Sequence, residues 1–124
     1  MVINAWFKKA ERHIDVCDIC FEIGDYDYIV NSCFLAMFSV IKAFLISKNL
    51  ECKTHEGLIY LFKINFVDTG LFDKDLFKFY CKTKELNTEF FRLNLDIFTE
   101  ELACDVFQKT VIFVDYSKNF LDVT

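Results

Sequence analysis

The sequence of 124 residues contains no proline and only three glycines, Gly24, Gly57 and Gly70. Proline breaks the interior of a helix and glycine weakens it, so little in this chain interrupts long helices. We therefore expect an all-helical protein. A chain of this length is predicted to form a single domain over residues 1–124, with enough residues to bury a real core.

Positive charge is also scarce. The 14 lysines and arginines are outnumbered by 19 aspartates and glutamates, and the net charge is −5. Phosphate backbones are bound by concentrated positive charge, so this balance argues against a broad nucleic-acid footprint and leaves room only for a local basic patch. The sequence also lacks a Gly-rich phosphate loop, an H-E-x-x-H spacing and an ordered Ser/His/Asp set.

The N-terminal segment MVINAWFKKAER lacks the apolar stretch and the cleavage site of a secretory signal. This absence predicts a cytoplasmic protein whose six cysteines are reduced thiols. Cys17 and Cys20 form a CxxC pair, but they fall inside a predicted helix and no second CxxC accompanies them. A structural zinc site needs four ligands, so we expect these cysteines to pack on a helix face, and we expect no metal and no cofactor.

Apolar residues, by contrast, are abundant. They make up 54% of the chain and include 16 phenylalanines, which is more than a small helical bundle normally buries. A subunit interface commonly takes up such a surplus, so a homodimer is expected.

The stretch from Tyr28 to Leu50 is the most apolar part of the chain, and Lys42 is its one charge between Ile29 and Ile46. Apolar side chains would cover most of the circumference of a helix here, which is typical of a helix buried on several sides. A membrane span is the alternative, but the run is near the lower length limit and contains Lys42. A single strand of this length is disfavoured. We favour a central core helix and expect no membrane association.

The remaining helices are predicted from apolar periodicity and from residues that start or stop helices. They run from about Val2 to Ile23, from His55 to about Val67, from a cap at Asp73 to about Leu93, and from Thr99 to about Phe120. Asp25, Thr54, Asp73 and Thr99 are predicted N-caps, and Asn49 is a predicted left-handed terminator.

Two features could contribute to a binding site. Lys74, Lys78 and Lys82 recur at every fourth position, so they line one face of a helix, where they could contact a phosphate backbone or a nucleotide. A solvated helix face gives the same pattern. His55 directly follows the Thr54 cap, where it could orient a loop or contribute to a site.

Several segments follow one another in a characteristic order: Trp6-Phe-Lys-Lys-Ala-Glu, Gly24-Asp-Tyr, the apolar run from Cys33 to Leu45, Lys53-Thr-His-Glu-Gly-Leu, and Thr69-Gly-Leu. This order resembles the HEPN domain family. The resemblance implies an antiparallel, up-and-down bundle of four to five helices that commonly dimerises. It also implies that the chain is related to ribonuclease toxins, which are often paired with a small nucleotidyltransferase antitoxin.

The ribonuclease signature of that family is an arginine followed, after four to six residues, by a histidine on the fourth helix. In this chain Asn87 falls where the arginine is expected and Arg92 falls roughly where the histidine is expected, while Asn94 replaces a tyrosine that some toxins carry. The only other arginine, Arg12, directly precedes His13, so the signature spacing does not occur.

Two hypotheses follow from the resemblance. The first is a catalytically inactive protein that acts as a binding or scaffold partner of a small nucleotidyltransferase. The alternative is a metal-independent ribonuclease or a nucleotide-binding protein with a non-standard site on the fourth helix. That alternative predicts that Asn87, Arg92, Lys82 and His55 converge on one cleft.

Overall fold

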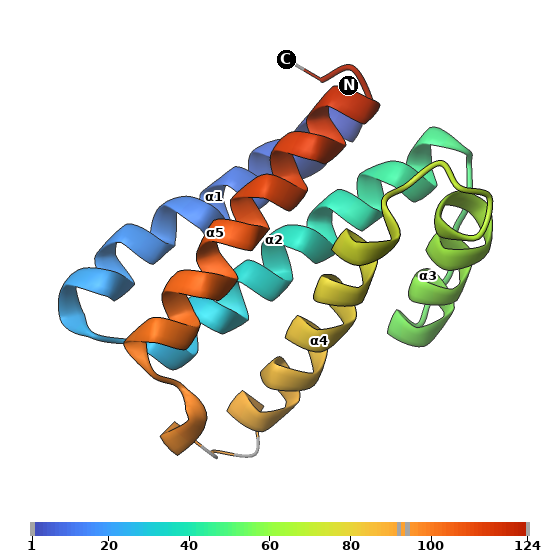
Figure 1. Cartoon of the computed structure of the whole chain (residues 1–124). Coiled ribbons are helices and arrows are strands. Elements are labelled where there is room, and N and C mark those ends of the chain that lie inside the picture. Colours follow the sequence, from blue (N-terminus) through green and yellow to red (C-terminus); the bar gives the residue numbers. More distant parts are fainter. Residues whose placement is uncertain (1, 92, 94, 124) are drawn as a thin grey trace.

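The computed structural model describes residues 2–91, 93 and 95–123, and all regular secondary structure in this part of the chain is helical. The long helices are α1 (Val2–Ile23), α2 (Tyr26–Ser47), α4 (Lys74–Phe91) and α5 (Glu100–Phe120). A shorter α3 (His55–Phe62) continues into a π-helical turn, η1 (Lys63–Val67), and a 3-10 turn, η2 (Leu95–Ile97), precedes α5. In Figure 1 the four long helices alternate in direction, with α1 and α4 descending and α2 and α5 ascending. The predicted all-helical bundle is confirmed.

Helix α2 lies at the centre and contacts α1, α3, α4 and α5. Its side chains at Ile29, Val30, Cys33 and Met37 are fully buried. Nearer its C-terminal end, the ring of Phe44 lies 5.0–5.4 Å, centroid to centroid, from four other phenylalanine rings, Phe62, Phe66, Phe72 and Phe120. Aromatic burial therefore joins α2 to α3, η1 and the end of α5.

By length and composition α2 could also cross a membrane. Its most apolar window has a mean hydropathy of 2.0, and 72% of that window is buried inside the protein. The core helix of a soluble protein has the same length and composition, so these properties alone do not choose between the two environments. The burial agrees with the role predicted for this stretch, that of a central core helix.

Most of the predicted helix ends are confirmed. The hydroxyl oxygen of Thr54 accepts a hydrogen bond from Gly57 N at 3.0 Å, and that of Thr99 accepts one from Leu102 N at 3.1 Å. Asp73 Oδ1 accepts from Asp75 N and Leu76 N at 2.8 and 3.0 Å. Asn49 has φ +56°, as expected for a left-handed terminator.

The prediction for Asp25 is wrong in its chemistry. This residue occupies the N-cap position of α2, but its side chain makes no capping hydrogen bond. Its backbone N–H instead donates to Cys20 O at 2.8 Å, across the turn that Gly24 makes with φ +77°. The tight turn therefore holds α1 and α2 together through the backbone.

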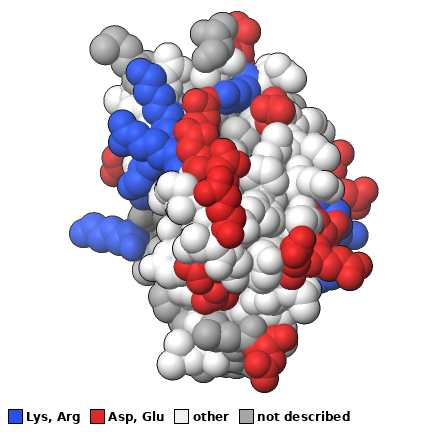
Figure 2. Space-filling model, turned by 90° about the vertical axis from the view of Figure 1, so that its left-hand side faces the viewer, with Lys and Arg blue, Asp and Glu red and all other residues white. Residues whose placement is uncertain are grey.

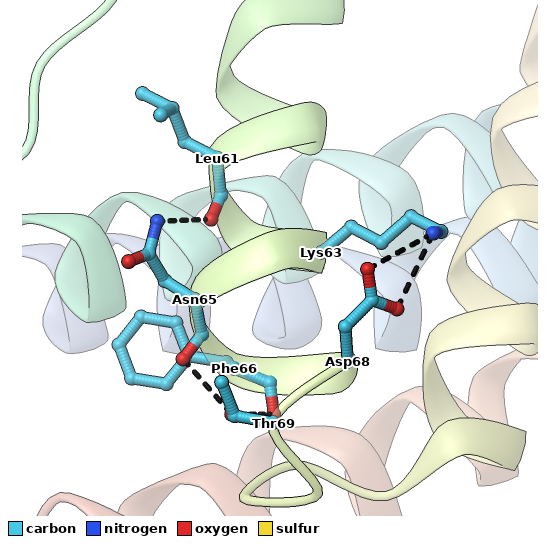
Figure 3. Close-up of polar contacts among 6 residues, drawn as sticks. All are labelled: Leu61, Lys63, Asn65, Phe66, Asp68 and Thr69. Atoms are coloured by element: carbon cyan, nitrogen blue, oxygen red, sulfur yellow. Dashed lines mark hydrogen bonds and ion pairs between the residues drawn. The ribbon is translucent and has the colours of Figure 1, made fainter.

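Side chains end the π-helical turn η1 (Figure 3). Asn65 Nδ2 donates to Leu61 O at 2.8 Å, and Thr69 Oγ1 donates to Asn65 O and Phe66 O at 3.1 and 3.2 Å. Phe66 O also accepts from Phe72 N at 2.8 Å, so side-chain and backbone donors together occupy the carbonyls at this helix end. An exposed ion pair, Lys63 Nζ to Asp68 Oδ2 at 3.2 Å, closes the same turn.

Candidate functional site

A groove of about 330 Å³ lies where α2, α3 and α4 meet. It is lined by Asn31, Phe34 and Leu35 of α2, His55 of α3, and Lys84, Asn87 and Thr88 of α4. Pockets for small ligands in proteins range from roughly 300 to 1,000 Å³, so the groove is large enough for one small molecule or one nucleotide unit. It brings together two of the residues predicted to form a site, His55 and Asn87.

Asn87 is the most unusual residue of the groove. Its side chain is only 7% exposed, and its Oδ1 atom has no hydrogen-bond partner. A buried polar atom without a partner costs about 1–3 kcal/mol relative to a satisfied one. Asn87 lines the groove, but its unpartnered Oδ1 atom is itself buried.

His55 closes the groove from the side of α3. Its imidazole stacks on the ring of Phe38, with the ring centroids 4.5 Å apart and an interplanar angle of 16°. The stack continues from Phe38 to Phe34 and from Phe34 to Tyr80, at 6.2 and 5.7 Å. The histidine is exposed, but this aromatic stack fixes the plane of its ring against α2.

Tyr80 lies at the inner end of the same stack. The residue is fully buried, and its hydroxyl, like Asn87 Oδ1, has no hydrogen-bond partner. Burial raises the pKa of the Tyr80 phenol far above its usual value, so the group stays neutral. Tyr80 and Asn87 are two turns apart on the same face of α4, which is turned toward the core.

The lysines of α4 divide into two groups. Lys84 is half-buried and lines the groove beside Asn87. Lys74, Lys78 and Lys82 are exposed and do not line it. The structure therefore brings together His55 and Asn87 but not the lysine stripe, while Arg92 and Asn94 lie outside the described residues.

The groove combines chemical groups that recognise a planar, polar and anionic molecule. Asn31 and Asn87 each offer a carboxamide, which can donate and accept hydrogen bonds. His55 offers a ring plane, and Phe34 and Leu35 offer an apolar wall. An ammonium at Lys84 supplies positive charge at the edge. A nucleotide has a base, a sugar and a phosphate that match these groups.

The CxxC pair lies elsewhere and is inaccessible. Cys17 and Cys20 are both buried in α1, facing Cys33 of α2 in a second, smaller apolar cluster. A hydrogen bond with Cys33 and burial raise the pKa of the Cys17 thiol. Among the described residues, no group of three or more His, Cys, Asp or Glu side chains is arranged to hold a metal ion.

Sequence reasoning missed Asn31 and Thr88 as parts of the groove. The available signal was a carboxamide within an otherwise apolar helical run, because a polar side chain in such a run needs a partner or a function. Asn31 stands between buried residues at Val30 and Ser32, and Asn87 lies on the buried face of α4. Spacing alone could not place the two helices side by side.

Comparison with known proteins gives consistent matches over nearly the whole chain. A family model described as the HEPN domain matches residues 3–120. A protein of Methanocaldococcus jannaschii named "putative toxin" is 31% identical over 96% of this chain and 88% of its own length. UPF0332 proteins of Thermotoga maritima and Archaeoglobus fulgidus are 27% and 31% identical, over 98% and 90% of this chain and 92% and 89% of their own lengths.

Proposed function

Because this chain belongs to the HEPN domain family, we propose that it acts by binding rather than by cutting, as the partner of a small nucleotidyltransferase in a toxin–antitoxin-like pair. The resemblance inferred from the sequence is confirmed at the level of the family. Similar proteins include two of Methanocaldococcus jannaschii that are named "putative toxin". Their names support the toxin part of the pair and say nothing of its partner.

The observation that carries the proposal is the chemistry at Asn87. The resemblance places this residue where ribonuclease members of the family have an arginine that stabilises negative charge on phosphate. Asn87 has no charge, and it is buried with an unpaired carboxamide oxygen. The only histidines of the chain, His13 and His55, precede Asn87, so none follows it at the signature spacing.

The absence of cutting is tested by incubating single-stranded RNA with the purified protein at high concentration and with EDTA present. We expect no cleavage above that of an Asn87→Ala/Arg92→Ala double variant. Metal-independent cleavage that disappears in the double variant would contradict the proposal. It would assign a modified ribonuclease site to α4.

The partnership is tested by co-expressing the chain with a small nucleotidyltransferase encoded beside its gene. We expect the two proteins to elute together in size-exclusion chromatography at a mass above that of either alone. Separate elution of two folded proteins, or the lack of any such neighbouring gene, would count against the pairing.

A second candidate function is nucleotide binding in the groove between α2, α3 and α4. The specific observation is that Asn87, His55 and Lys84 lie around one opening of about 330 Å³. Part of the alternative drawn from the sequence is thus consistent with the structure, since His55 and Asn87 share a groove. Lys82 of that set lies outside the groove.

Calorimetric titration with nucleoside monophosphates distinguishes a binding site in the groove from one on the exposed lysine stripe. We expect Lys84→Gln to weaken binding and Lys78→Gln, on the exposed face of α4, to leave it unchanged. Loss of binding in Lys78→Gln alone would move the site to the stripe. No binding by the unaltered protein would remove this candidate.

A further inference from the structure

A second pocket, separate from the groove, opens between the N-terminal end of α1, the C-terminal half of α2 and the segment that leads into α3. Its volume is about 420 Å³. Its inner wall is aliphatic, formed by Leu45, Ile46, Leu50 and Leu58, and its charged lining residues are Lys42, Lys53 and Glu51. The pocket therefore combines an apolar interior with an edge on which two lysines outnumber one glutamate.

Lys42 is held at this pocket by two aromatic rings. Its Nζ lies 5.6 Å from the ring centre of Trp6 and 5.8 Å from that of Phe38, and Lys9 Nζ lies 5.1 Å from the Trp6 ring. Two ammonium groups thus lie against one indole. The ring attracts each of them, but the two positive charges repel each other. Among the described residues, no carboxylate forms an ion pair with Lys9, Lys42 or Lys53. An incoming anion would neutralise this charge.

The positive charge extends beyond the pocket. Lys8 and Arg12, which are exposed on the same half of α1 as Lys9, add to it. In Figure 2 blue side chains gather at the upper left, with a column of red side chains directly beside them and further red groups at the right and the lower edge of a mostly white face. In a protein with a net charge of −5, this is a local basic patch. Its extent fits a segment of a macromolecule better than a small ion.

The pocket chemistry favours a peptide over RNA. Proteins bind single-stranded nucleic acid by stacking bases on open aromatic faces. Here the one aromatic residue that lines the pocket, Trp6, already carries two ammonium groups, and the remaining wall is aliphatic. An aliphatic side chain fits that wall, and carboxylates beside it would pair with the lysines.

We infer that this pocket docks an acidic segment of a partner protein, with one aliphatic side chain against Leu45 and Leu58 and flanking carboxylates on Lys42 and Lys53. The inference rests on the proposed partner-binding role but not on the identity of the partner. Opposite charge across the contact would speed association and make it sensitive to salt.

Cys52 provides a local probe because it lines the same pocket and is partly exposed. The experiment measures alkylation of Cys52 by iodoacetamide, by mass spectrometry, with and without a synthetic peptide in which glutamates flank a leucine pair. We expect the peptide to slow Cys52 alkylation about tenfold at low salt and much less at 1 M salt. Cys104, on α5 and outside the pocket, serves as the internal reference in the same sample.

Charge-neutralising variants locate the contact. Lys42→Gln and Lys53→Gln should each reduce the protection of Cys52, and Lys78→Gln on exposed α4 should not. Lys53 is exposed between α2 and α3, so its variant keeps the test informative if Lys42→Gln alters the fold. A peptide that protects Cys52 equally in all variants, or that fails to protect it at all, would overturn the inference. Protection by a uridine oligonucleotide but not by the peptide would overturn it in favour of RNA.

The outcome is separable from that of the proposed function. Co-elution with a nucleotidyltransferase in the absence of peptide protection would retain the pairing and reject this docking surface. Protection without co-elution would retain the surface and reject that partner.

Discussion

At the scale of single residues, we expect the buried carboxamide of Asn87 to affect both the stability of the protein and the binding of a ligand. A side chain that is 7% exposed and has an unpaired oxygen destabilises the folded protein unless something binds to it. Tyr80 has the same defect on the same helix, but it does not line the groove. The two residues therefore form a matched pair, of which only Asn87 lines the groove.

Replacing Asn87 by Leu should stabilise the protein and abolish nucleotide binding in the groove. Leucine has a similar shape and removes the unpaired oxygen, so we expect a gain of about 1 kcal/mol in the free energy of unfolding. Chemical denaturation measures the gain, and calorimetry measures the binding. Tyr80→Phe is the control, since it should stabilise the protein without affecting binding. A destabilised Asn87→Leu variant would show that the carboxamide has a structural partner.

Cys52 should be alkylated at lower pH than Cys81. Hydrogen bonds from the backbone and side chain of Thr54 lower the pKa of the Cys52 thiol, with Cys52 Sγ 3.7 Å from Thr54 Oγ1. Burial raises the pKa of the Cys81 thiol. Because the thiolate is the reactive form, the pH-rate profile of Cys52 should be displaced to the acidic side. Mass spectrometry of alkylated peptides measures both profiles in one sample, and coinciding profiles would contradict the assigned hydrogen bonds.

At the scale of helices, the ends are set by side chains close to them in sequence. Thr54, Asp73 and Thr99 each accept a backbone hydrogen bond from the first turn of the helix that follows. Glu100 and Glu101 add negative charge at the start of α5, where the helix dipole is positive. These local bonds define where α3, α4 and α5 begin.

Thr99→Ala should lower the free energy of unfolding by about 1 kcal/mol, because it removes the hydroxyl that accepts from Leu102 N. Thr99→Ser should retain most of the stability, since serine caps equally well. Thermal unfolding followed by circular dichroism compares the three proteins. Equal losses in Thr99→Ser and Thr99→Ala would mean that the capping hydroxyl does not contribute to the stability, because serine retains that hydroxyl and alanine does not.

At the scale of the whole molecule, phenylalanines link helices that are distant in sequence. Phe44 of α2 contacts rings from α3, η1, the loop before α4 and the end of α5. Because so many elements share one ring, loss of that ring weakens the whole bundle.

Phe44→Ala should lower the free energy of unfolding by about 3–5 kcal/mol, owing to the lost apolar burial and the cavity left behind. Phe44→Leu, which keeps most of the volume, should cost about 1 kcal/mol. Denaturant titration measures both. A small effect of Phe44→Ala would mean that the surrounding rings collapse into the space.

The surface of α1 bears on assembly. Val16, Ile19 and Ile23 are 44%, 63% and 69% exposed and follow one another at helical spacing, so they form an apolar stripe on the outer side of α1. We expect the protein to be a homodimer, and Ile19→Glu to raise the monomer fraction if this stripe is the interface. Sedimentation velocity measures the populations, with Lys74→Glu on exposed α4 as control. An unaltered dimer in Ile19→Glu would place the interface elsewhere.

The sequence by itself determined the helical class, the order of the helices, the central position of α2 and most of the helix ends. These properties depend on apolar periodicity and on residues within one turn of each helix end. Both features involve residues that are close together in the sequence. Even there the local rule had a limit: Asp25 occupies the expected position, but its backbone rather than its side chain makes the bond.

Only the tertiary structure decided which polar residues meet. His55 and Asn87 share a groove because α3 and α4 both pack against α2 and because Phe38 and Phe34 hold the intervening stack. The same packing leaves Lys74, Lys78 and Lys82 outside the groove and places Lys42, the one charge within the apolar run of α2, at the edge of a second pocket. Periodicity shows which face of a helix is apolar. Which neighbouring helix packs against that face depends on contacts between segments far apart in sequence, and a local sequence pattern does not predict it.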